Sequence, residues 1–119
     1  MNWDCFAVSI LFYIFAKKIM DIPFKEGDII VFDEKYLVIF AGLKNNQAII
    51  FHALWIVDYN MNYGPYIKIK TGTGIGYYTH ERPVRYATMS EIQTFFGLIE
   101  KNGYKWNPKE NKIEQIVYV

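Results

Sequence analysis

Four neighbouring residues, Thr79, His80, Glu81 and Arg82, are of types that could carry out catalysis. A histidine titrates near neutral pH, and a carboxylate beside it suits a His–Glu pair to general acid–base chemistry. The set of Arg82, Glu81 and Thr79 has the residue types that a small ribonuclease would need. However, no nucleophile or partner base is fixed beside it, and adjacent polar residues are ordinary in loops. We therefore assign no catalytic residue.

The stretch Thr71–Gly76, TGTGIG, resembles a phosphate-binding loop in its glycine content alone. It lacks the Gly-Lys-Ser/Thr ending of a P-loop, and no amphipathic helix follows it. We interpret it as a flexible β-hairpin loop. His52 stands within an apolar strand and is interpreted as a satisfied core or half-exposed histidine. Asp28 and Asp33 are expected at opposite ends of a strand, not as a pair.

A basic and aromatic face is the best candidate for a binding surface. Tyr66, Lys68 and Lys70 share one face of an alternating strand, and two arginines follow after one connection. If these strands are neighbours, aromatic rings could stack a ligand while the cations neutralise its charge. The alternative is a solvated sheet face. The candidate ligand-binding residues are Tyr66, Lys68, Lys70, Tyr77, Arg82 and Arg85, with Tyr78 between them.

The composition indicates one globular domain with a substantial core. The chain has 119 residues, of which 52% are hydrophobic and 18% aromatic. Its net charge of +1 gives no strong attraction to nucleic acid or to an anionic membrane. One cysteine excludes an internal disulfide, and with only two histidines the sequence has no zinc pattern. We expect no metal, no cofactor and a cytoplasmic location.

Residues 1–19 form an apolar extension whose run Cys5–Ala16 is shorter than the ~20 residues of a membrane span. It also lacks the order of a secretory signal, because Asp4 precedes the run and Lys17 and Lys18 follow it. Three interpretations remain open: a core or partner-docking helix, a marginal membrane anchor, or a prefix outside the native domain. The single β-rich domain is expected at residues 20–119.

Short strands are expected at 29–32, 36–40, 48–59, 66–70, 77–79 and 84–87. Both faces of the stretch 48–59 are apolar, so it is buried on both sides or bent around a barrel. Thr88 and Glu91 have capping-box spacing, which predicts a helix at 89–102 with a single apolar stripe. Gly103 ends it, and a terminal hairpin follows. The fold class is mainly β (α+β): a small SH3-like barrel or curved antiparallel sheet with one C-terminal amphipathic helix.

Four short motifs resemble a family of small uncharacterised bacterial and phage proteins. They are Phe24-Lys25-Glu26-Gly27-Asp28, Ile39-Phe40, Arg85-Tyr86-Ala87-Thr88 with Glu91, and Gly103-Tyr104-Lys105-Trp106-Asn107. The resemblance extends from Phe24 to Ile113. It implies an SH3-like barrel with a helical appendix and a phage or mobile-element origin, and it implies no activity.

These features favour a non-catalytic binding or accessory module for an unknown protein or a small anionic ligand. The alternative is an RNA-binding or small ribonuclease-toxin-like protein, by analogy of fold alone. Membrane attachment through residues 5–16 is a third, weaker hypothesis. The oligomeric state is left open.

Overall fold

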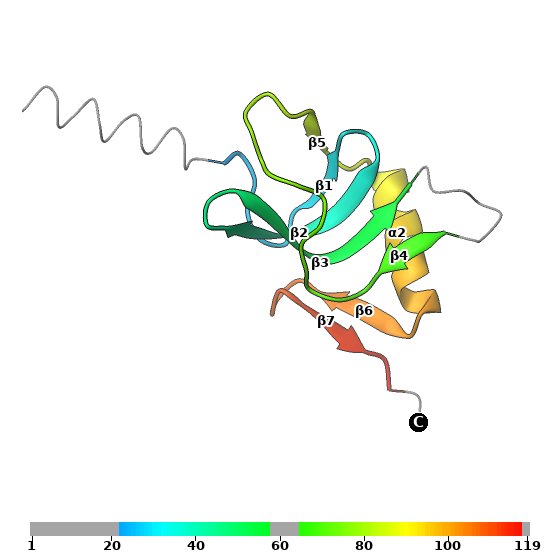
Figure 1. Cartoon of the computed structure of the whole chain (residues 1–119). Coiled ribbons are helices and arrows are strands. Elements are labelled where there is room, and N and C mark those ends of the chain that lie inside the picture. Colours follow the sequence, from blue (N-terminus) through cyan, green and yellow to red (C-terminus); the bar gives the residue numbers. More distant parts are fainter. Residues whose placement is uncertain (1–21, 58–64, 118–119) are drawn as a thin grey trace, which may run out of the picture.

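A computed structural model describes residues 22–57 and 65–117, which form a curved antiparallel sheet, a helix and a hairpin (Figure 1). The sheet has the strand order β4-β3-β2-β1-β5, and no pairing of β4 with β5 closes it among the described residues. The predicted mainly β class with a C-terminal helix and terminal hairpin is confirmed. The elements are β1 (Ile29–Phe32), β2 (Tyr36–Lys44), β3 (Ala48–Ile56), β4 (Tyr66–Lys68), β5 (Val84–Tyr86), α2 (Met89–Lys101), β6 (Tyr104–Asn107) and β7 (Lys112–Gln115).

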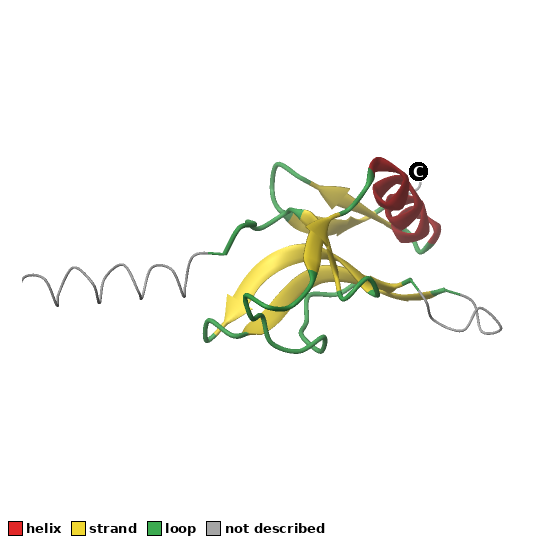
Figure 2. Ribbon diagram, turned by 90° about the horizontal axis from the view of Figure 1, so that it is seen from above, coloured by secondary structure: helices red, strands yellow, loops and turns green. Residues whose placement is uncertain are grey.

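The sheet is buried on both faces, as the apolar pattern of β3 predicts. Figure 2 shows α2 against one side of the curved sheet. There Phe95 and Ile99 of the helix pack on Val31, Leu37 and Ala53, together with partly buried residues of the hairpin. The other face carries a second core. Its buried members are Phe24, Ile30, Phe32, Val38, Phe40, Ile49, Phe51, Leu54 and Ile75.

A β-bulge in β3 changes which face its side chains occupy. Ile39 of β2 lies opposite Ala53, whereas Phe40 lies opposite Phe51, so His52 is an extra residue in the ladder. An extra residue bends a strand and re-aims a side chain. Accordingly Phe51 belongs to one core and Ala53, two residues later, to the other. The bulge thereby sets the direction in which His52 leaves the strand.

The N-terminus of α2 is capped as its sequence predicts. The Glu91 N–H donates to Thr88 Oγ1 at 3.2 Å, and the Thr88 N–H donates to Glu91 Oε1 at 2.9 Å. The helix ends at Lys101, one residue earlier than predicted, with Asn102 as its C-cap.

One expected strand is missing. Residues 77–79 form no strand, since only Tyr77 makes an isolated bridge to Ala48. The second strand of the predicted terminal hairpin is Lys112–Gln115. Residues 1–19 lie outside the described part, so the interpretations of that extension stay predictions. No described helix is long and apolar enough to cross a membrane.

Arg85 ties the helix start to the turn between β1 and β2. Its guanidinium donates to both carboxylate oxygens of Glu91, at 2.8 and 2.9 Å, and to both of Glu34, at 2.7 and 2.9 Å. These bonds raise the pKa of Arg85, Glu91 contributing more than Glu34. The same guanidinium lowers the pKa of Glu34. Hydrogen bonding by Arg85, aided by Thr88, lowers the pKa of Glu91 to about 2.

Glu91→Gln should lower the unfolding free energy near neutral pH by about 2 kcal/mol, because glutamine keeps the cap but loses the charge. A carboxylate with a depressed folded-state pKa stabilises the fold above its unfolded-state pKa. That stability disappears as the pH falls through about 2. Urea unfolding at several pH values should therefore show wild type and variant converging in acid. The matched control is Glu100→Gln, on the exposed face of the same helix. A difference between wild type and Glu91→Gln that is independent of pH would contradict the assignment.

Candidate functional site

Arg82 contacts the glycine-rich stretch, and its guanidinium forms an ion pair with Asp33. Nε and Nη2 form a two-pronged contact with the Asp33 carboxylate, with a shortest distance of 2.8 Å. The remaining donors reach two carbonyls: Nη1 donates to Tyr77 O at 3.0 Å, and Nη2 also donates to Ile75 O. The guanidinium also lies 5.1 Å from the Phe32 ring centroid, and the side chain is only 11% exposed. Arg82 is therefore a structural anchor and does not reach outward.

The glycine-rich stretch, interpreted from the sequence as a flexible β-hairpin loop, is anchored at both ends and in the middle. We call Gly72–Tyr77 the glycine arch. Gly72 exchanges two backbone hydrogen bonds of 3.0 Å with Phe51, and Gly76 O accepts from Ile49 N at 3.1 Å. Between them the Ile75 side chain is buried in the core. These contacts come from residues distant in sequence, so the glycine content alone does not predict them.

Four carbonyl groups of the arch accept hydrogen bonds, whereas its amide groups after Gly72 are unpaired. The carbonyls of Gly72 and Gly76 accept from β3, and those of Ile75 and Tyr77 accept from Arg82. Within the described part of the chain, the N–H groups of residues 73–77 have no hydrogen-bond partner. In a trans peptide the N–H points opposite to the preceding carbonyl, so the amides of Thr73 and Tyr77 point away from β3 and that of Gly76 points away from Arg82. Unpaired N–H groups on an anchored backbone are available to donate to an anion.

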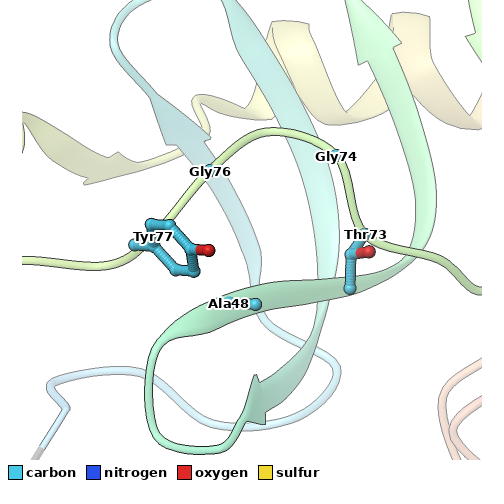
Figure 3. A pocket seen from close by; sticks show the side chains of 5 residues that line it. All are labelled: Ala48, Thr73, Gly74, Gly76 and Tyr77. Carbon is cyan, nitrogen blue, oxygen red and sulfur yellow. The ribbon is translucent and has the colours of Figure 1, made fainter.

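A shallow hollow of about 260 Å³ lies beside the arch. Figure 3 shows the Tyr77 ring on one side, Thr73 on the other, and Ala48 of β3 between them. Gly74 and Gly76 complete the lining, and their positive φ angles of 142° and 96° are values that side-chain-bearing residues rarely adopt. Among the described residues, no carboxylate lines the hollow.

Two of the lysines predicted to bind a ligand, Lys68 and Lys70, lie near the arch. A Cβ added to Gly72 would lie 3.2 Å from Lys68 Nζ, so this ammonium rests against the first residue of the arch. It also lies 5.7 Å from the Phe51 ring centroid, a cation–π contact. Lys70 is exposed two residues before Gly72.

The predicted site residues divide between the two edges of the sheet. Tyr66 and Lys68 belong to β4, while Arg85 belongs to β5 at the opposite edge and is held between two glutamates. Tyr77 lines the hollow, and Arg82 binds two carbonyls of the arch. The structure thus gathers Lys68, Tyr77 and Arg82 around the arch and separates Arg85 from them.

The chain around His80 does not form a compact catalytic set. Arg82 turns to Asp33, while His80 and Glu81 are exposed. The His80 ring makes an edge contact with Tyr78, at 5.6 Å between centroids. Asp28 and Asp33 lie at opposite ends of β1, as expected from the sequence.

Sequence reasoning missed a polar cluster around His52. Its Nε2 lies 3.0 Å from Glu26 Oε1, its Nδ1 lies 3.4 Å from Thr71 Oγ1, and its ring centroid is 5.1 Å from that of Trp106. Both ring nitrogens have partners, as expected for a satisfied histidine. The cluster joins the first turn, the β3 bulge, the start of the arch and the hairpin. Only the bulge brings these residues together, and no sequence signal marks it.

A second hollow, of about 190 Å³, lies at the β5 edge between Pro23, Val84 and Tyr86. The Tyr86 hydroxyl donates to Pro23 O at 3.0 Å, and nearby Arg85 is held by its two glutamates. This lining offers few polar groups to a ligand, so we place the candidate site at the arch. Comparison of the chain with protein-family models, curated proteins and solved structures gives no match.

Arg82→Lys should lower the unfolding free energy by about 2 kcal/mol, because lysine keeps the charge but cannot reproduce the two-pronged bond and both carbonyl contacts. Urea unfolding followed by tryptophan fluorescence measures the loss. The control is Lys112→Met, which removes an exposed pair at 3.7 Å and should cost no more than about 0.5 kcal/mol. Equal stability of Arg82→Lys and wild type would show that the arginine does not anchor the arch.

Proposed function

We propose that this protein is a non-catalytic binding module of the SH3-like barrel type, of phage or mobile-element origin, that holds a small anionic ligand at the glycine arch. The observation that carries the proposal is the run of unpaired backbone N–H groups at residues 73–77. Backbone donors fixed before binding lose little entropy when an anion arrives, so they suit recognition of a small ion. The Lys68 ammonium beside Gly72 adds a positive charge.

The ion pairs that neutralise Arg82 and Arg85 favour a small ligand over a long nucleic acid. An RNA-binding groove needs a continuous track of cations along the phosphate backbone. Arg82 and Arg85 are each neutralised by carboxylates, so neither extends the charge of Lys68 and Lys70 into such a track. The size of the hollow, about 260 Å³, also lies below the range of drug-sized pockets.

The barrel type is supported by strand order. Consecutive strands β1 to β4 pair as an antiparallel meander, and β5 returns to pair with β1. The backbone of the arch continues the edge of β3 beyond β4 through the Phe51–Gly72 and Ala48–Tyr77 bridges. The arch therefore occupies the side on which a small barrel would otherwise remain open.

Inorganic phosphate should bind the full chain at low ionic strength with a Kd of about 1 mM, measured by isothermal titration calorimetry. Lys68→Met should weaken binding about fivefold, because it removes the ammonium beside the arch while leaving the amides. Added salt should also weaken binding by screening.

Lys35→Met is the matched control, since Lys35 likewise lies over an aromatic ring, 5.4 Å from the Tyr36 centroid. It should bind phosphate as wild type does. An absence of saturable binding, or equal losses in both lysine variants, would contradict the proposed site.

A further inference from the structure

Tyr77 is a large aromatic side chain held outward from a fixed backbone. It is 65% exposed, although it lines the hollow. Its carbonyl accepts from Arg82. The residues on either side of it are also bonded: Gly76 O accepts from Ile49 N of β3, and Tyr78 N donates at 2.8 Å to the carbonyl of Gln47, the residue before β3. The ring therefore projects from a backbone anchored on two sides. A flat aromatic side chain on an anchored backbone offers contact area to a ligand at a low cost in conformational entropy.

The Tyr77 ring and several residues of the unpaired run line the same hollow. The lining includes Thr73, Gly76 and Tyr77, whose N–H groups belong to the unpaired run, and the Tyr77 ring forms one wall (Figure 3). The floor is Ala48, which leaves room where a larger residue would fill the hollow. An anion bound by the arch amides thus has its substituent next to the exposed ring face.

The volume limits how much of the ligand enters. A hollow of about 260 Å³ is smaller than the 300–1,000 Å³ of pockets that enclose a whole organic ligand. An oxyanion can occupy it, while a larger substituent must extend outward along Tyr77. A planar ring gains most in that position, because bases stack favourably on an aromatic side chain.

We infer that the ligand of the arch is a phosphate group carried by a planar ring system, the chemistry of a nucleoside monophosphate. The phosphate contacts the arch amides and Lys68, and the ring stacks on Tyr77. This inference rests on the proposed function, because it needs the arch to bind an anion. Recognition of the ring by stacking alone gives little discrimination between bases, since every base has a flat face.

The experiment compares four probes by isothermal titration calorimetry: inorganic phosphate, ribose phosphate, adenosine and adenosine monophosphate. Adenosine monophosphate should bind about tenfold more tightly than ribose phosphate, the difference that one stacked ring provides. Tyr77→Leu should remove this gain and leave inorganic phosphate binding unchanged. Tyr77→Phe keeps the ring and should retain the gain. Tyr86→Leu, at a 58% exposed tyrosine on the opposite edge strand, is the control and should behave as wild type.

The outcomes separate this inference from the proposed function. If phosphate binds but adenosine monophosphate gains nothing over ribose phosphate, the ring contact is wrong and the anion site stands. A gain that survives in Tyr77→Leu also overturns the inference. If neither phosphate nor adenosine monophosphate binds, the anion site itself is wrong.

Discussion

The Arg82 guanidinium is the contact on which the candidate site depends. It holds Asp33 at the end of β1 and the carbonyls of Ile75 and Tyr77. These bonds connect Arg82 to residues that lie 49, seven and five positions earlier in the sequence. Because Arg82 binds the Ile75 carbonyl, the N–H of Gly76 in the same peptide group points away from Arg82. The positive charge of Arg82 suggests a ligand contact. Its role is instead to orient backbone groups, and Asp33 neutralises its charge.

The two-sided burial of the sheet explains where the remaining polar groups can lie. Helix α2 and the hairpin cover one face, and the second core fills the other. Polar side chains are therefore confined to the edges and to irregularities such as the His52 bulge. There His52 links Glu26, Thr71 and Trp106. Thr71 directly precedes the arch, so the bulge and Arg82 together fix both its start and its end.

Local signals predicted more of this fold than of its site. The capping box of Thr88 and Glu91 and the helix that follows are correct to within one residue, because every contact involved lies within one turn. The predicted strand at 66–70 ends at Lys68, two residues early, although Ile67 and Ile69 do face the same core. The contacts of the glycine arch were not predicted, because they come from Phe51, Ile49 and Arg82, which composition and spacing do not pair with it. Three predicted site residues do gather at the arch, but Arg82 has a different role from the one expected.

An anion held at the glycine arch would accept hydrogen bonds from the N–H groups of residues 73–77. Two-dimensional amide NMR spectra recorded during a phosphate titration test this most directly, because each N–H group is observed separately. We expect saturable shifts that are largest at residues 73–77 and share one binding constant. Shifts that are absent from the arch, or that spread equally over exposed lysines elsewhere in the chain, would contradict it.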